Sequence, residues 1–121
     1  MSELYIGIDL VDIDRIKLSI EKYQIKFLDR IFSSEEQEYC QSKSNPAMHY
    51  AGKFAAKEAV IKSIKSSGFD KHIELRSISI INNADGSPHV DLDIKYNGLV
   101  KVSISHTETH AIAFALSELN H

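Results

Sequence analysis

The sequence predicts an α+β fold in which an N-terminal strand and helices are followed by an antiparallel sheet, because the hydrophobic period changes along the chain. In residues 12–31 apolar side chains recur at spacings of three and four, the period of an amphipathic helix. From residue 73 onward they alternate with polar ones, the period of a strand with one buried face, and turn residues separate the runs. Helices and strands segregated in this way are typical of the α+β class.

The first strand is expected at residues 4–11, where apolar side chains are nearly continuous and should be buried on both faces. Asp9 lies near its end and shares its strand phase with Gly7, a glycine that leaves room for another group to approach. The position leaves two roles for Asp9. It either accepts backbone hydrogen bonds or serves a ligand.

An amphipathic helix should follow over residues 12–31, capped by Asp12 and broken near Gln24. Its basic side chains occupy a side of their own: Arg15, Lys22, Lys26 and Arg30. Such a stripe is a solvated face in most proteins and a docking surface for an acidic protein in a minority. Residues 33–34 should open another helix, because each serine is followed three positions later by Glu or Gln, as in a capping box.

A long helix should start at Asn45-Pro46 and end around residues 66–68, a Ser-Ser-Gly sequence. At 100° per residue, one arc of about 120° holds small and apolar residues together with Glu58 and Lys62. Glu58 therefore points where a core residue would, and an ionised carboxylate there needs a cation. Three candidates are open: Lys62 one turn later, a distant basic side chain, or a metal ion.

Three further lysines of this region, Lys53, Lys57 and Lys65, could neutralise phosphate groups. A solvated helix face explains Lys53 and Lys57 about as well. Lys62 differs from them because it lies in the arc of Glu58.

Four strands are expected in the second half, where they should form an antiparallel meander. They lie at residues 73–81, with a bulge near 76–77, and at residues 90–96, 100–105 and 111–116, with a turn at 85–88. His106 ends the strand at 100–105 in phase with its apolar side chains, and alone it is more typical of a semi-buried histidine. A hairpin at residues 107–109 argues against a zinc pair between His106 and His110.

The composition is that of one globular domain, residues 1–121, with 43% hydrophobic and 26% charged residues. A net charge of −3 argues against a nucleic-acid partner. No run reaches the roughly 18 apolar residues of a membrane span, and the N-terminal residues lack a signal-peptide pattern. We therefore expect a cytoplasmic protein with no membrane partner. The one cysteine, Cys40, should be a structural thiol.

Two carboxylates on separate elements, a nearby lysine and a histidine at a strand end suit a site that holds Mg²⁺ on a phosphorylated ligand. Magnesium is commonly bound by one or two carboxylates together with waters and phosphate oxygens. The residues concerned are Asp9, Glu58, Lys62 and His106. Their types are suggestive of this chemistry without being specific to it.

Three segments resemble the three motifs of the short holo-acyl-carrier-protein synthases, in the same order and spacing. They are residues 6–11 followed by Arg15, residues 52–59 with Lys62, and residues 102–107. The resemblance spans nearly the whole chain. It implies a phosphopantetheinyl transferase fold and transfer of 4′-phosphopantetheine from coenzyme A to a serine of apo-acyl carrier protein, with release of adenosine 3′,5′-bisphosphate.

The resemblance also implies roles for individual residues. Asp9 and Glu58 match the magnesium ligands. Glu58, Lys62 and His106 are the expected catalytic residues, and the expected contacts of coenzyme A are Lys53, Lys62, Lys65, His106 and Thr107. Arg15 matches a residue that docks the acidic carrier protein, which favours the docking reading of the stripe with Lys22 and Lys26. Family members of this length are similar to a homotrimer with active sites shared between subunits.

The chain departs from the family pattern after the second motif, where residues 63–68 replace a glycine-rich loop. Lys65 in this segment offers a point charge in place of backbone N–H groups, and Lys53 stands where arginine is common. Two other hypotheses therefore stay open. One is a coenzyme A-binding or carrier-binding module with weak catalysis. The other is a scaffold in which Glu58 and Lys62 form only a salt bridge.

Overall fold

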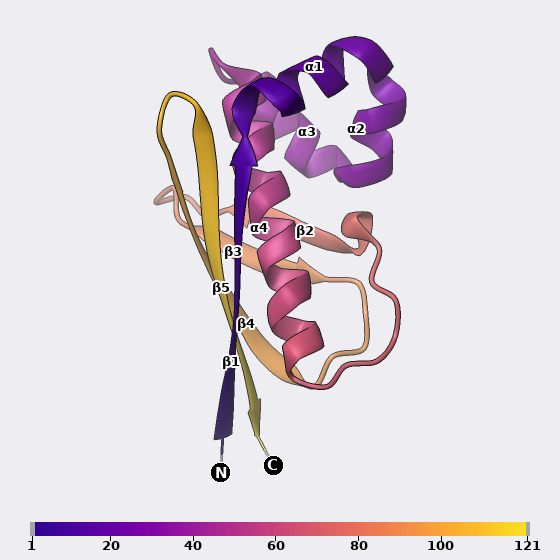
Figure 1. Cartoon of the computed structure of the whole chain (residues 1–121), viewed down its shortest axis with the longest axis vertical. Coiled ribbons are helices and arrows are strands. Elements are labelled where there is room, and N and C mark those ends of the chain that lie inside the picture. The colour runs from indigo at the N-terminus through magenta and orange to yellow at the C-terminus, as the bar shows by residue number, and fades with distance from the viewer. Residues whose placement is uncertain (1, 121) are drawn as a thin grey trace.

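A computed structural model describes residues 2–120, and its mixture of helices and antiparallel strands confirms the α+β class (Figure 1). The elements are, in order, β1 (Ser2–Asp12), α1 (Ile13–Tyr23), α2 (Ile25–Ile31), α3 (Ser34–Gln41), α4 (Pro46–Ser66), the 3₁₀ turn η1 (Leu75–Ser77), β2 (Ile78–Asn82), β3 (Pro88–Leu92), β4 (Gly98–His106) and β5 (His110–Asn120). No helix of this part of the chain combines the length and apolar character needed to cross a membrane.

The strands form two separate antiparallel sheets, so the expected single meander is wrong. One sheet has the order β1-β5-β4, and the other is the β2-β3 hairpin. β1 pairs with β5 along its whole length, from Ser2 opposite Asn120 to Asp12 opposite His110. The first and last strands are therefore neighbours, and both chain ends lie at the same end of the molecule (Figure 1).

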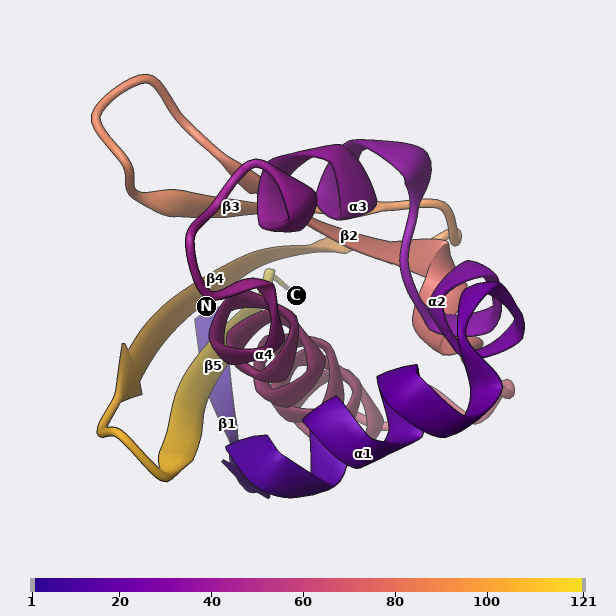
Figure 2. The ribbon, with the colours of Figure 1, turned by 90° about the horizontal axis from the view of Figure 1, so that it is seen from above.

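Helix α4 lies in the curve of the three-stranded sheet, with α1 on one side and α3 with the β2-β3 hairpin on the other (Figure 2). Small side chains allow this close packing, because Ala55, Ala56 and Ala59 are fully buried. A Cβ at Gly7 would lie 2.1 Å from the carbonyl oxygen of Ala59. The room left by Gly7 is thus used by the backbone of α4 itself, and the residues after it on β1 are held against that helix.

The other face of β1 is exposed, so the prediction of a strand buried on both faces is wrong. Four alternating apolar residues are 56–63% exposed: Leu4, Ile6, Ile8 and Leu10. The physical reason is that α4 covers only one face of the sheet. Ile112 and Phe114 on β5 and Leu99 on β4 extend this exposed apolar surface, which is larger than isolated surface residues would make.

The helix boundaries follow local capping signals. The Asp12 carboxylate accepts hydrogen bonds from the backbone N–H of Asp14 at 2.9 Å and of Arg15 at 3.4 Å, which confirms the cap. The break at Gln24 is also confirmed, with φ 52° and ψ −130°, a conformation that costs about 1–3 kcal/mol for a residue other than glycine. Ser33 starts α3 in a complete capping box.

Two strand predictions fail at their ends. Residues 73–77 are not a bulged strand: Leu75–Ser77 form a 3₁₀ turn, and β2 begins only at Ile78. The reason is long-range, because the ammonium of Lys57 attracts the carbonyls of Leu75 and Ile78. β3 ends at Leu92, whereas the strand was expected to reach residue 96.

Candidate functional site

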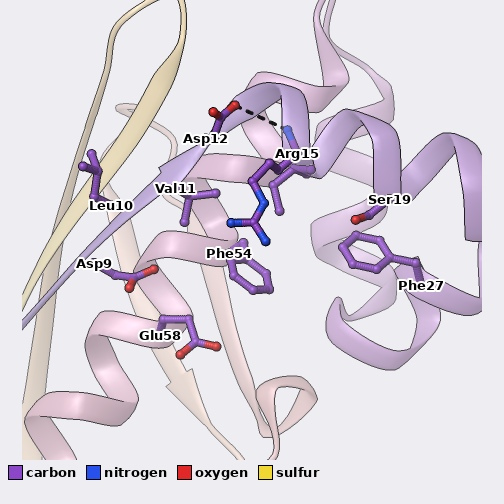
Figure 3. Close-up of a pocket in the computed structure, with 10 residues that line it drawn as sticks. Asp9, Leu10, Val11, Asp12, Arg15, Ser19, Phe27, Phe54 and Glu58 are labelled. Atoms are coloured by element: carbon purple, nitrogen blue, oxygen red, sulfur yellow. Dashed lines mark hydrogen bonds between the residues drawn. The ribbon is translucent and has the colours of Figure 1, made fainter.

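Asp9 and Glu58 line one cavity of about 350 Å³ between the end of β1, helix α1 and helix α4 (Figure 3). Two more charged residues, Asp12 and Arg15, lie at its rim. The remaining wall is largely apolar and includes Ile16, Phe27 and Phe54. The fold therefore brings together two carboxylates that are 49 positions apart in the sequence, as the magnesium-site prediction requires.

Glu58 is half-buried, and its pKa is raised, first by desolvation and then by the charge of Asp9, while Lys62 partly opposes the shift. The repulsion shows that the two carboxylates act on each other electrostatically. Both Glu58 oxygens are without a hydrogen bond or ion pair from any residue in the range 2–120. A cation between Asp9 and Glu58 would remove this repulsion.

Lys62 is paired with Asp9, so the salt bridge between Glu58 and Lys62, one of the three open candidates, is not formed. Its Nζ lies 3.2 Å from Asp9 Oδ1 and donates to the carbonyl oxygen of Ile8 at 2.9 Å. The pair is partly open to solvent, since the Lys62 side chain is 54% exposed. Lys62 can therefore exchange these partners for a phosphate without a large desolvation change.

The donor set of the cavity fits a hard divalent cation. Carboxylate oxygens are the ligands that Mg²⁺ prefers, and it keeps several waters or phosphate oxygens besides one or two of them. Within residues 2–120, no three His, Cys, Asp or Glu side chains converge as a complete protein cage. A site of two carboxylates thus leaves coordination positions for a phosphorylated ligand, whereas a structural zinc site would be closed by protein groups.

His106 lies in a different cavity of about 150 Å³, at the end of β4 and near the start of α4. His49, Lys53 and Asn82 line it as well, and neither Asp9 nor Glu58 does. The pKa of His49 is lowered, mainly by burial and further by the charges of Lys43, His106 and Lys53. Lys53 places one positive charge at this cavity, which suits an anionic ligand. Thr107 follows His106 in the exposed hairpin turn.

Lys53 and Lys57 are both buried, so the solvated-face interpretation is wrong for each. Lys53 is 4% exposed and donates to the carbonyl of Ile80 at 2.5 Å and to Asn82 Oδ1 at 2.7 Å. Burial lowers its pKa. Lys57 is fully buried against Glu36. Lysines can occupy such places only when their ammonium groups are hydrogen-bonded to partners, here partners distant in the sequence.

Lys65 is exposed near the end of α4, where it donates to the carbonyl of Lys71. It lines a shallow cavity of about 480 Å³ together with Lys62 and β1 residues 6–8. The two lysines expected to meet coenzyme A on this side of α4 thus share one surface, next to the exposed apolar strand face.

The basic stripe is split between the two short helices. Arg15 on α1 turns its guanidinium into the first cavity, toward Phe54 (Figure 3). Lys22 stands 5.2 Å from the centre of the Tyr23 ring, and Lys26 lines a surface hollow with Tyr23 and Phe27. All three basic residues are exposed, and the structure leaves them available to a partner.

Sequence reasoning missed two kinds of residue here. Leu18 and Ile25 lie between the basic residues and are 62% and 59% exposed. They could have been found in the sequence as apolar residues that do not fall on the buried face of their helices. Asn82 and His49 beside His106 were also missed. A polar residue at a strand end next to a turn was the signal for Asn82, whereas nothing local marked His49.

Comparison with known proteins gives a consistent result. Residues 5–115 match the family model described as the 4′-phosphopantetheinyl transferase superfamily. A relative from Protochlamydia amoebophila, a holo-[acyl-carrier-protein] synthase, is 42% identical over 118 residues, which cover 93% of this chain and 96% of the relative.

Two solved structures have the same fold. A holo-(acyl-carrier-protein) synthase from Bacillus anthracis in complex with CoA (3′,5′-ADP) is 30% identical, with a TM-score of 0.79 and 96% of each chain covered. The Helicobacter pylori enzyme in complex with coenzyme A is 33% identical, with a TM-score of 0.80 and coverage of 91% of this chain and 96% of that one. The chain therefore belongs to the holo-[acyl-carrier-protein] synthases of the 4′-phosphopantetheinyl transferase superfamily.

Proposed function

We propose that this protein transfers 4′-phosphopantetheine from coenzyme A to a serine hydroxyl of apo-acyl carrier protein, with Mg²⁺ as cofactor and adenosine 3′,5′-bisphosphate as the second product. The observation that carries the proposal is the pair of mutually repelling carboxylates, Asp9 and Glu58, in one cavity beside Lys62. The names of the relatives and the coenzyme A complexes of the two solved structures support the same reaction.

Asp9 and Glu58 would hold the magnesium ion. When bound, Mg²⁺ supplies charge neutralisation at the diphosphate of coenzyme A and at the phosphorus under attack. The chain's own task is to bind and orient. Lys62 places an ammonium beside the carboxylates, where it can donate to a phosphate oxygen. Apolar Phe54 on the wall of the same cavity limits the access of water.

The remaining contacts of coenzyme A are assigned to two surfaces. Lys65 extends the surface of Lys62. His106 and Thr107 lie at the end of β4, and Lys53 lines the cavity of His106. Because both hydrogen bonds of Lys53 Nζ are with protein oxygens, its contribution would be mainly a positive potential in that cavity, with His106 providing the direct hydrogen bond.

We infer that the protein is a homotrimer with active sites shared between subunits. In one chain, the cavity of His106 is separate from the cavity of Glu58. The exposed apolar face of β1, β4 and β5 lies on the side of the sheet away from α4 and has the character of an oligomer interface. A neighbouring subunit seated there would cover this face and could bring its His106 toward Glu58.

Mixing two inactive variants tests the shared site. Glu58→Gln and His106→Ala should each lose activity, and their co-refolded mixture should regain part of it, because a mixed trimer contains a site with both residues intact. Sedimentation of the wild-type protein should give three chains per particle. A monomer, or a mixture as inactive as its components, would contradict the shared site.

The α1-α2 surface is assigned to the carrier protein. Arg15, Lys22 and Lys26 offer positive charge on a protein of net charge −3, and Leu18 and Ile25 offer apolar contacts between them. Charge reversal in Arg15→Glu should raise KM for the carrier about tenfold and leave KM for coenzyme A nearly unchanged. Equal changes of both KM values would argue against docking at this surface.

The decisive experiment is a mass measurement. The protein is incubated with Mg²⁺, coenzyme A and several candidate apo-carrier proteins, and the mass of each carrier is then measured by mass spectrometry. We expect an added phosphopantetheine group on at least one carrier, equimolar adenosine 3′,5′-bisphosphate, and no reaction when the metal is chelated. Binding of coenzyme A without a mass shift on any carrier would favour the alternative of a catalytically weak binding module, for which the replaced segment at residues 63–68 is the motive.

A further inference from the structure

A second charged pair, outside the site, joins α4 to α3. Lys57 and Glu36 are both fully buried, with Lys57 Nζ 2.6 Å from Glu36 Oε1. The same ammonium donates to three carbonyl oxygens, those of Ile31 at 2.8 Å, Leu75 at 3.2 Å and Ile78 at 2.5 Å. None of these groups lines the cavity of Glu58.

The carboxylate of Glu36 is equally engaged. Its Oε1 also accepts the N–H of Ser33 at 2.9 Å, which is half of the capping box of α3. Its Oε2 accepts the N–H of Ile80 on β2 at 2.8 Å. The pair therefore connects α4 with the end of α2, the start of α3, the turn η1 and strand β2. A buried charge pair of this kind is geometrically demanding, because any shift leaves polar groups unpaired.

The contact with Ile31 gives the pair a second consequence. Ile31 is the last residue of α2, so Lys57 places a positive charge on the carboxyl end of that helix. At its other end, α2 meets α1 at Gln24, a junction with the strained φ of 52°. The bend is thus held from its far side by α4.

Helices α1 and α2 form the wall of the first cavity that faces Glu58. Ile16 and Arg15 come from α1 and Phe27 from α2, whereas Phe54 and Glu58 come from α4. Lys57 is the residue immediately before Glu58. Any movement of α2 away from Lys57 therefore changes the distance between the α1-α2 surface and the carboxylates.

We propose that Lys57 and Glu36 are positioning residues that fix the α1-α2 surface relative to the Asp9–Glu58 carboxylates, and so set where the carrier serine is presented. This role rests on the proposed function, in which α1-α2 docks the carrier. The pair acts through the position of α2 and contacts neither substrate. Its loss should therefore impair use of the carrier protein more than use of coenzyme A.

The test compares Lys57→Met with Tyr50→Phe, a matched control on the same helix. Tyr50 is also fully buried, and its hydroxyl accepts from Gln41 Nε2 at 2.9 Å and donates to the carbonyl oxygen of Gln37, so both of its hydrogen bonds are with α3 and neither reaches α2. In Lys57→Met, amide hydrogen exchange should rise at least about tenfold more in residues 13–31 than in β1 and β5, where a rise reports only the lower global stability. KM for the carrier should rise about tenfold, with KM for coenzyme A within about twofold of wild type.

In the control, neither the exchange of residues 13–31 nor either KM should change by more than about twofold. If Lys57→Met does not fold, Glu36→Gln gives the same comparison, because its amide is nearly isosteric with the carboxylate. Exchange that rises equally across the protein, or equal changes of both KM values, would overturn the positioning role. If the wild type transfers nothing to any carrier, the proposed function fails, while selective exchange in residues 13–31 would still support the structural part of this inference.

Discussion

Helix α4 carries two clusters of lysine and carboxylate, and they differ in how fully their charges are used. On one side, the buried Glu36–Lys57 pair has a partner for each carboxylate oxygen and four acceptors around the ammonium. On the other side, Glu58 has no hydrogen-bond partner within residues 2–120 and is repelled by Asp9. We call Glu36 with Lys57 the saturated cluster and Asp9, Glu58 and Lys62 the open cluster. The first stabilises the fold, whereas the second has oxygen atoms available to bind a ligand.

Solvent explains why both clusters can exist in one small domain. A fully buried charge must be paired and hydrogen-bonded, and no buried side-chain polar atom in the described part of the chain is without a partner. The Asp9–Lys62 pair is partly exposed, so water can satisfy its free hydrogen-bonding positions. Unused carboxylate oxygens are therefore tolerated at the cavity and would not be tolerated at Glu36.

The largest effect on stability is expected at the saturated cluster. Glu36→Ala should lower the free energy of unfolding by about 3–5 kcal/mol, because it leaves the Lys57 charge buried without its counter-charge. Urea denaturation measures this loss. The double variant Glu36→Leu with Lys57→Met should be destabilised less than Glu36→Ala, since it removes both charges together. A double variant less stable than the single one would show that the carbonyl contacts of Lys57 matter more than the ion pair.

The open cluster should behave in the opposite way. Glu58→Gln should reduce transfer to the carrier at least about 100-fold, because it removes a metal ligand. Its free energy of unfolding should be unchanged or slightly raised, since the repulsion from Asp9 disappears. The activity is followed by the mass of the carrier and the stability by thermal unfolding. Near-normal transfer by this variant would end the metal-ligand argument.

The raised pKa of Glu58 predicts a pH dependence that belongs to the open cluster alone. Its folded-state pKa lies above the ordinary 4.5, so the folded protein holds this proton more tightly than the unfolded chain does. Between 4.5 and the raised pKa, this contribution to stability therefore falls as pH rises. The thermal midpoint of wild type relative to that of Glu58→Gln, measured in metal-free buffer, should therefore decrease as pH rises through this range.

Added Mg²⁺ should oppose the decrease, because an ion that binds only the folded state stabilises it by mass action. The gain in midpoint should be greater above the raised pKa of Glu58 than below it, where protons compete for the carboxylate. A stabilisation by Mg²⁺ that does not depend on pH, or that persists in Glu58→Gln, would place the ion elsewhere.

The same contrast explains what the sequence could predict. Helix starts were predictable because caps are local: Asp12 and the Ser33–Glu36 box act within three residues. The meeting of Asp9 with Glu58 was predictable from the family resemblance and the helix arc of Glu58. The burial of Lys57 was not predictable, because its counter-charge, Glu36, lies 21 positions away on α3. The carbonyl groups that it contacts at the 3₁₀ turn are also distant, 18–21 positions away.

The prediction that both faces of β1 are buried failed for a related reason. A continuous apolar strand has the same pattern whether its second face meets the chain's own helices or another molecule. Ile6 and Ile8 are exposed in the single chain, so the pattern was recording a surface that one chain does not cover. Sequence period alone therefore does not tell whether the second face of such a strand is covered within its own chain.

The smallest expected effect on stability is at Lys62, the lysine of the open cluster. Lys62→Met should change the free energy of unfolding by less than about 1 kcal/mol, because its pair with Asp9 is partly exposed and such pairs contribute little. Lys57→Met, on the same helix, should cost several times more. Denaturation of both variants under one set of conditions measures the ratio. Equal losses would mean that the Asp9–Lys62 pair is a structural contact, and its lysine would then not be free to turn toward a phosphate.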